Sequence, residues 1–115
     1  MRRTERLTKG SDFRSVYGTG KSVADRMLVL YLLSRSGELK LGISVSKKVS
    51  RGSVGRNRLK RLVKESFREL RPQIECGYHM VIIVRVAAKD AKYGQILSSL
   101  SRLMKRAGLL SNAKG

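Results

Sequence analysis

One segment of the sequence, residues 56–71, strongly constrains how the chain can fold. It reads Arg-Asn-Arg-Leu-Lys-Arg-Leu-Val-Lys-Glu-Ser-Phe-Arg-Glu-Leu-Arg and is followed by Pro72, which cannot continue a helix. In a helix, which turns by about 100° per residue, one side of this segment collects the residues suited to a core. They are Leu59, Leu62, Val63, Ser66, Phe67 and Leu70. The pattern therefore predicts a helix that packs this side against the rest of the protein.

The opposite side of the same predicted helix is almost entirely cationic. It carries Asn57, Lys60, Arg61, Lys64, Arg68 and Arg71, while Arg58, Glu65 and Glu69 lie on one flank. A helix side that merely faces solvent usually alternates acidic and basic residues, because opposite charges four residues apart stabilise the helix. A side with a single sign of charge instead favours a polyanionic partner.

The charge of the whole chain supports this interpretation. Among 115 residues there are 26 lysines and arginines against 8 acidic residues, a net charge of +18. Such an excess destabilises a compact chain by self-repulsion unless a polyanion offsets it. Residues 47–71 alone carry a net +8, whereas residues 72–88 are neutral. This distribution is typical of nucleic-acid-binding proteins, and an acidic membrane surface is the second candidate.

Length and composition predict a folded protein of one domain, residues 1–115, ordered over about 5–107 with a flexible tail at 111–115. The single cysteine, Cys76, excludes an internal disulfide and favours a reducing compartment. No apolar run approaches the roughly 20 residues that span a bilayer, and the first residues lack the pattern of a secretory signal. We therefore expect a soluble cytoplasmic protein without membrane association.

Three strands are predicted from the apolar patterns. Residues 26–34 form a strand buried on both faces, and residues 39–46 alternate apolar residues with mostly small polar ones, as in a half-exposed strand. A tight turn between them predicts that the two pair as a hairpin. Residues 78–86 form a third, strongly apolar strand, which we expect beside that hairpin.

Two further helices are predicted. One runs from Ser11, as its N-cap, to about Gly18, and the other begins after Asp90 as its cap. The residues after the first helix, Gly-Thr-Gly-Lys-Ser, look like part of a phosphate-binding loop. However, the first glycine of that motif would fall at Ser15, and a helix precedes where a strand is required. We interpret this stretch as a turn.

Reactive side chains are scarce in the sequence. Cys76 and the only histidine, His79, have the spacing of half a zinc site, but no second pair of ligands exists. The eight acidic residues are scattered, and no two are placed to hold metal ions or to act as acid and base. We therefore predict no catalytic residue and no metal ligand in this chain.

The aromatic residues leave two interpretations open. Phe13 and Tyr17 lie one helical turn apart in a basic segment, where they could stack the bases of a single strand. The alternative is packing in the core, which the residues alone favour, and which they also favour for Tyr31 in its strand.

Several of these segments together resemble the bacterial ribonuclease P protein subunit. Residues 42–49, Gly-Ile-Ser-Val-Ser-Lys-Lys-Val, are followed by residues 56–62, Arg-Asn-Arg-Leu-Lys-Arg-Leu, which match that family's signature. Residues 12–17 and 29–31 match as well, in the right order and spacing. The resemblance covers residues 5–107.

The resemblance implies an α+β fold: a two-layer α/β sandwich with a four-stranded mixed sheet, three helices and a left-handed β-α-β crossover through the basic helix. A left-handed crossover would be the reverse of the right-handed connection that is almost always found. It also implies a subunit of ribonuclease P, bound to a catalytic RNA that removes the 5′ leader of precursor tRNA. The RNA would carry out hydrolysis with Mg²⁺ held mainly by RNA, and no protein partner would be required.

The resemblance also implies two groups of binding residues. The residues that would contact the catalytic RNA are Lys47, Lys48, Arg56, Asn57, Arg58, Lys60, Arg61, Lys64 and Arg68. Contacts with the leader of precursor tRNA, in a central cleft, fall to Phe13, Tyr17 and Tyr31. Three residues depart from the family pattern: Gly55 is a poor helix former just before the signature, Ser53 stands where alanine is frequent, and Lys64 stands where arginine is common.

Two other functions would suit the same charge and fold class. One is a structural RNA-binding protein of ribosomal type, and the other is a DNA-compacting protein that lays the basic helix in a groove. Aromatic residues near a strand with small polar residues favour the ribonuclease P subunit, because a purely structural binder needs no channel for a single strand.

Overall fold

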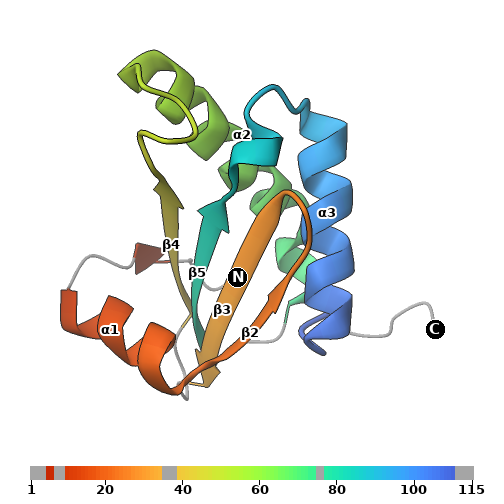
Figure 1. Ribbon diagram of the computed structural model, residues 1–115. Coiled ribbons are helices and arrows are strands. Elements are labelled where there is room, and N and C mark those ends of the chain that lie inside the picture. The colour runs from red at the N-terminus through yellow and green to blue at the C-terminus, as the bar shows by residue number, and fades with distance from the viewer. Residues whose placement is uncertain (1–4, 7–9, 35–38, 75–76, 111–115) are drawn as a thin grey trace.

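The structure is a computed structural model that describes residues 5–6, 10–34, 39–74 and 77–110 (Figure 1). Its strands are β1 (Glu5–Arg6), β2 (Lys21–Ala24), β3 (Leu28–Ser34), β4 (Leu39–Val45) and β5 (Tyr78–Val84), and its helices are α1 (Gly10–Thr19), α2 (Ser53–Leu70) and α3 (Tyr93–Arg106), with short 3₁₀ turns η1 (Arg71–Gln73) and η2 (Val86–Ala88). The expected tail, the turn before β4 and Cys76 lie outside the described residues.

The strands form one mixed sheet in the order β1-β4-β5-β3-β2. The pairs β2–β3 and β3–β5 are antiparallel, whereas β1–β4 and β4–β5 are parallel. Its four longer strands and the three helices make up the expected α+β fold, to which β1 adds a two-residue strand at one edge. The chain passes through α2 between the parallel neighbours β4 and β5, and the left hand of this crossover stays a prediction.

The predicted hairpin of β3 with β4 is wrong. The last strand, β5, lies between them, pairing with β3 from Leu28–Val84 to Ser34–Tyr78 and with β4 along its whole length. Both faces of β5 are largely buried, whereas one face of β3 is only half-buried. The prediction followed a local turn signal, but a strand that is apolar on both sides buries most surface at the centre of a sheet.

The other antiparallel neighbour of β3 is β2, a short polar strand whose first two residues, Lys21 and Ser22, belong to the stretch that we interpreted as a turn. Asp25 closes the β2–β3 connection, because its Oδ1 accepts hydrogen bonds of 2.9 Å from the backbone N–H groups of Met27 and Leu28. Gly20 lets α1 approach β3 closely, since a Cβ there would collide with the carbonyl oxygen of Leu32. Four residues with little apolar character carry almost no strand signal, which explains why β2 was missed.

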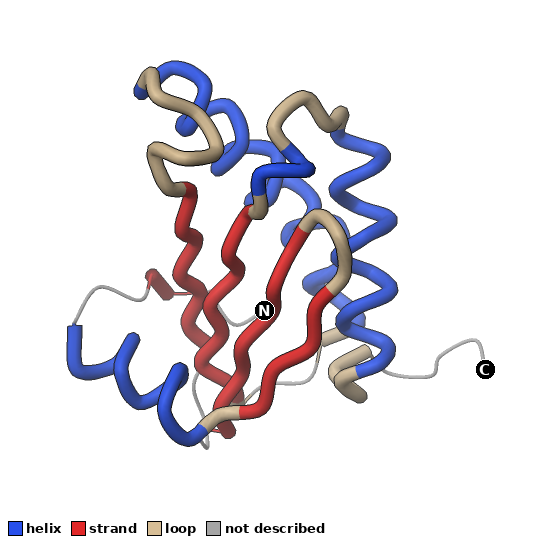
Figure 2. The backbone as a smooth tube through the Cα atoms, in the orientation of Figure 1, coloured by secondary structure: helices blue, strands red, loops and turns tan. Residues whose placement is uncertain are grey.

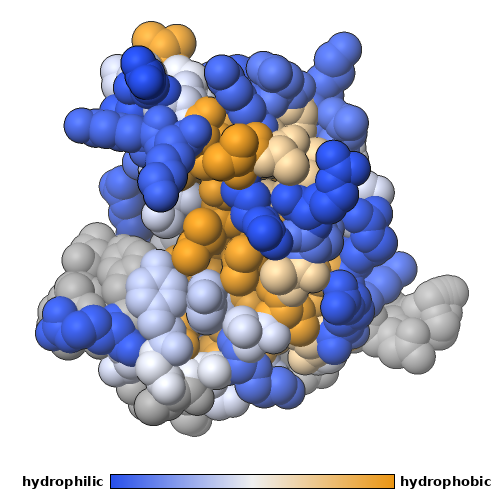
Figure 3. Space-filling model, viewed as in Figure 1, coloured by the Kyte–Doolittle hydropathy of each residue, from blue (hydrophilic) through white to orange (hydrophobic). Residues whose placement is uncertain are grey.

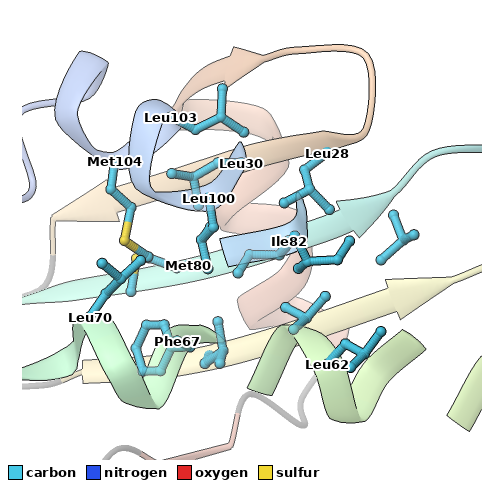
Figure 4. Close-up of a cluster of buried hydrophobic side chains, with 14 of the residues drawn as sticks. Leu28, Leu30, Leu62, Phe67, Leu70, Met80, Ile82, Leu100, Leu103 and Met104 are labelled. Atoms are coloured by element: carbon cyan, nitrogen blue, oxygen red, sulfur yellow. The ribbon is translucent and has the colours of Figure 1, made fainter. Parts of the chain in front are cut away.

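The main core lies between α2, α3 and one face of the sheet. It includes Leu28 and Leu30 of β3, Met80 and Ile82 of β5, Leu62, Phe67 and Leu70 of α2, and Leu100, Leu103 and Met104 of α3 (Figure 4). All six residues predicted to face inward from α2 are buried. Ser66 fits among them because its hydroxyl donates to the carbonyl oxygen of Leu62 at 2.9 Å.

The helix ends differ from the predictions in detail. Helix α2 begins at Ser53, before the signature, and Pro72 lies in the turn that follows its end. The predicted cap of α3, Asp90, is wrong: α3 begins at Tyr93, and Gln95 Oε1 accepts the backbone N–H of Lys92 at 2.9 Å. An acidic residue predicts a cap by its type alone, but here a glutamine side chain reaches back to the backbone instead.

Candidate nucleic-acid interface

The second face of the sheet is only partly covered. Helix α1 crosses one end of it, while α2 and α3 lie on the other side of the sheet (Figures 1 and 2). Val16 of α1 is fully buried against Val81 of β5. The strand register places two rows of residues on this face: Gly42, Val81, Tyr31 and Ser22, and then Ser44, Ile83, Val29 and Ala24. The second row lies farther along the sheet and is only partly buried or exposed.

Tyr17 and Tyr31 meet where α1 crosses the sheet. Their ring centroids are 4.9 Å apart with an interplanar angle of 80°, an edge-to-face contact. Tyr17 keeps 41% of its surface exposed, so it is not a core residue. Burial of the remainder, and secondarily the neighbouring Tyr31, raise the pKa of Tyr17 above its ordinary value. Phe13 lies in α1, but its side chain is outside the described part of the chain.

The surface of this face is apolar in the middle and hydrophilic around it (Figure 3). The row of Ser44, Ile83 and Val29 contributes small and aliphatic side chains to this face. Such a floor leaves room for a ligand backbone, and the aromatic rings of Tyr17 and Tyr31 lie beside it. This arrangement suits an unpaired nucleotide strand, whose bases are flat and apolar and whose phosphates are charged.

The cationic side of α2 points away from the core, as predicted. Asn57, Arg61, Lys64 and Arg68 are exposed, and Lys60 is half-buried. The loop that leads from β4 to α2, residues 46–52 (the β4–α2 loop), adds exposed Lys47, Lys48 and Arg51. We call the exposed residues Arg61, Lys64 and Arg68, together with Lys60, the α2 ridge.

Two predicted RNA contacts, Arg56 and Arg58, are engaged within the protein. Arg56 Nη1 donates to the carbonyl oxygens of Ser50 at 2.9 Å and Arg51 at 2.6 Å. Arg58 Nη2 donates to the carbonyl oxygen of Ala91 at 2.7 Å, in the turn before α3. Both side chains are half-buried. Sequence reasoning missed these contacts because the acceptors are backbone carbonyls, which have no residue pattern.

A second group of arginines converges on the β2–β3 turn. Asp25 Oδ2 accepts hydrogen bonds from Ser99 Oγ at 2.5 Å and from Arg102 Nη2 at 3.2 Å. Arg85 donates to the carbonyl oxygen of Asp25, and Arg106 donates to that of Ala24. Burial alone would raise the pKa of Asp25, but the hydrogen bonds outweigh it and hold this pKa below its ordinary value. Through Ser99, Arg102 and Arg106, these hydrogen bonds connect the turn to α3.

The described residues provide few groups for chemistry. They contain no cluster of three or more histidine, cysteine, aspartate or glutamate side chains that could hold a metal ion. His79 lies buried in β5. Among the helices of the described segments, none is long and apolar enough to cross a membrane.

Comparisons with known proteins agree with this architecture. The family model for ribonuclease P matches residues 1–108. The ribonuclease P protein component of Clostridioides difficile strain 630 is 47% identical over 106 residues, which cover 90% of this chain and 92% of that protein. The structure of the RNase P protein from Staphylococcus aureus is 34% identical, with a TM-score of 0.81, and covers 95% of this chain and 100% of that one. The RNase P protein from Thermotoga maritima is 30% identical, with a TM-score of 0.80, and covers 89% and 96%.

A mixed sheet with a half-open face and a separate cationic helix defines a class of α/β proteins suited to nucleic acid. Within that class, the chain belongs to the ribonuclease P family, as a protein component of that enzyme. It is therefore a subunit of an RNA-processing endoribonuclease that contains an RNA subunit.

Proposed function

We propose that this chain binds the catalytic RNA through the α2 ridge and the β4–α2 loop, and binds the 5′ leader of precursor tRNA on the half-open face of the sheet. The binding promotes endonucleolytic removal of the leader, which gives the mature 5′ end of the tRNA. The separation of the two surfaces carries this proposal: a cationic one lies on α2 and its preceding loop, and an aromatic-apolar one lies on the opposite side of the sheet.

The α2 ridge and the β4–α2 loop suit a folded RNA because their charge has one sign. Phosphates bind lysine and arginine largely through charge, and binding releases the cations condensed on the nucleic acid. If about six cations contact phosphates, log K falls with log salt with a slope of roughly −4 to −5. That slope corresponds to a loss in affinity of about 10²- to 10³-fold between 50 and 200 mM salt.

The half-open face suits the leader because it offers rings and an apolar floor. A base stacked on an aromatic side chain gains about 1–3 kcal/mol, and any base can stack, since each has a flat face. Tyr17 and Tyr31 supply rings at one end of the floor, and Phe13, one turn earlier in α1, is proposed as a third. Leaders of different sequence could therefore bind in the same place.

In this proposal the RNA subunit carries out the hydrolysis, and Mg²⁺ is held mainly by RNA. The described residues of this chain do not fit a metal site of their own. What the chain contributes is charge and shape: cations that offset phosphate repulsion, and a surface that holds the leader in place. The same proposal places the protein in the cytoplasm, where precursor tRNA is made.

A cleavage assay tests the proposal most directly. The cognate RNA subunit is incubated with precursor tRNA at low Mg²⁺, with and without the protein. We expect the protein to restore cleavage at Mg²⁺ concentrations at which the RNA alone is slow. No effect of the protein on cleavage would contradict the proposal, and a flat salt dependence of RNA binding would exclude the α2 ridge as the main contact.

The cell itself offers a second test. RNA that copurifies with the tagged protein is expected to be enriched in the ribonuclease P RNA and precursor tRNA. Recovery of mainly ribosomal RNA would instead support a structural RNA-binding protein of ribosomal type, and recovery of DNA would support a DNA-compacting role.

A further inference from the structure

We propose that Arg56 is a positioning residue of the RNA interface: it holds the β4–α2 loop in shape and makes no contact with RNA itself. The inference rests on the proposed binding of RNA by the α2 ridge and the β4–α2 loop. It assigns to the first arginine of the Arg-Asn-Arg segment a role different from that of Arg61, which lies in the same helix.

The first half of the β4–α2 loop is fixed by its own backbone and by the core. The backbone N–H groups of Val49 and Ser50 donate to the carbonyl oxygen of Ser46, at 3.1 and 3.3 Å. Val49 is only 3% exposed and belongs to the main core. This buried side chain anchors the loop beneath its two exposed lysines, Lys47 and Lys48.

The second half of the loop is held by Arg56. One guanidinium nitrogen, Nη1, donates to two successive carbonyl oxygens, those of Ser50 and Arg51. Hydrogen bonds from a charged donor are stronger than neutral ones. They matter here because the loop carries three cations within five residues, 47–51, and repulsion among them favours an open loop.

Gly55 supports the same arrangement independently. Ser50 lies so close to the first turn of α2 that a Cβ at Gly55 would collide with the Ser50 hydroxyl. Gly55, although a poor helix former, therefore leaves the space that the loop needs to fold back against α2. Gly55 and Arg56 together seat the loop against the start of α2.

The hydrogen bonds of Arg56 direct its side chain toward the loop rather than toward solvent. Its side chain is half-buried and directed at the loop carbonyls, whereas Arg61 is exposed on the outer side of α2. We therefore expect removal of Arg56 to weaken RNA binding only through the loop cations. Removal of Arg61 is expected to weaken it directly.

A double-mutant cycle separates the two roles, because residues that act through a common element give non-additive losses. Affinity for the cognate RNA subunit is measured for the full chain, for Arg56→Gln, for the pair Lys47→Gln and Lys48→Gln, and for all three changes. We expect Arg56→Gln to reduce affinity about three- to tenfold alone, and less than about twofold once the loop lysines are gone. Arg61→Gln removes the same charge as a matched control, and its loss is expected to be the same in both backgrounds.

Hydrogen exchange in the free protein gives a readout that does not involve RNA. We expect Arg56→Gln to speed exchange of the loop amides, and Arg61→Gln to leave them unchanged. If Arg56→Gln proves poorly folded, Arg56→Lys passes through the same cycle. That change keeps the charge but replaces the guanidinium with a single ammonium group, so the loop amides exchange faster if Arg56 braces the loop and at an unchanged rate if it only contacts phosphate.

Each outcome either supports or overturns the positioning role of Arg56. Losses that add in the Arg56 cycle would show a direct RNA contact and overturn the proposal, and unchanged affinity with a loosened loop would overturn it as well. Failure of the unaltered chain to bind the RNA subunit would instead overturn the proposed function.

Discussion

Tyr17 of α1 and Tyr31 of β3 meet edge to face across the boundary between the helix and the sheet, with ring centroids 4.9 Å apart. Such a pair favours this geometry because the positive edge of one ring faces the negative surface of the other. The contact fixes the end of α1 over the sheet and leaves part of Tyr17 exposed. The half-open face therefore has a firm aromatic border on one side.

The first prediction concerns this pair. Tyr31→Ala is expected to weaken binding of leader-bearing precursor tRNA by about 5- to 150-fold, because one stacked base is worth about 1–3 kcal/mol. Binding of mature tRNA, which lacks the leader, is expected to stay the same, and Tyr31→Phe is the control that keeps the ring. Affinities of the holoenzyme for both RNAs measure this. Equal losses for the two RNAs would argue against the leader site.

The second prediction is that Arg58 contributes to the stability of the fold through its hydrogen bonds within the protein. Its two hydrogen bonds reach the carbonyl oxygens of Lys89 and Ala91, before α3. Arg58→Gln is expected to lower the free energy of unfolding by about 1–3 kcal/mol, since a charged donor is removed from a partly buried site. Urea unfolding measures the change, and Arg61→Gln, at an exposed position, is expected to stay within about 0.5 kcal/mol of the unaltered chain. Unchanged stability of Arg58→Gln would contradict the bracing role.

The third prediction concerns two glycines in helices. Nothing lies within 4 Å of a Cβ added at Gly94 of α3, so Gly94→Ala is expected to raise stability by about 0.5–1 kcal/mol. At Gly55 of α2 the same added carbon meets Ser50. Gly55→Ala is therefore expected to show no gain or a loss in stability, and the further change Ser50→Gly to recover the gain. Thermal unfolding of the variants decides it, and equal stabilisation at both glycines would contradict the close contact.

The fourth prediction is a pH dependence centred on Asp25. Hydrogen bonds to its carboxylate hold the folded pKa below the ordinary value of 3.8. The ionised form therefore stabilises the fold above the unfolded pKa, and this contribution is lost as the pH falls through the lower, folded pKa. We expect Asp25→Asn to lower the free energy of unfolding by about 1–3 kcal/mol at pH 7. The gap from the unaltered chain should narrow below about pH 4.

Urea unfolding between pH 7 and pH 3 measures the gap, with Asp90→Asn as a control at an exposed acidic residue. A gap for Asp25→Asn that stays the same at every pH would show that the carboxylate charge contributes nothing.

The sequence predicted best what depends on local periodicity. The inward and outward sides of α2 follow from its spacing alone, because burial of a helix face is decided within a few turns. Strand order was not predictable in this way, since the choice of β5 as the partner of both β3 and β4 depends on the total burial of the sheet. The fold class therefore came from the family resemblance rather than from the pattern of the strands.

The same distinction between local spacing and long-range packing applies to the residues of the candidate site. The outward position of Arg61 and Lys64 was predictable, whereas the engagement of Arg56 with the loop was not, because its acceptors are carbonyl oxygens that every residue has. The approach of Tyr17 to Tyr31 joins a helix to a strand and depends on where α1 crosses the sheet. No spacing in the sequence encodes that crossing.

The central place of β5 has a consequence for how the protein is made. During synthesis β3 and β4 leave the ribosome well before Tyr78–Val84, yet each of them has β5 as its long partner. Until those residues emerge, the nascent chain carries two apolar strands with open edges, the kind of surface that chaperones cover. The two parts of the sheet, β1–β4 and β2–β3, therefore join only after most of the chain has been translated. A fragment that stops before Tyr78 is expected to aggregate rather than fold.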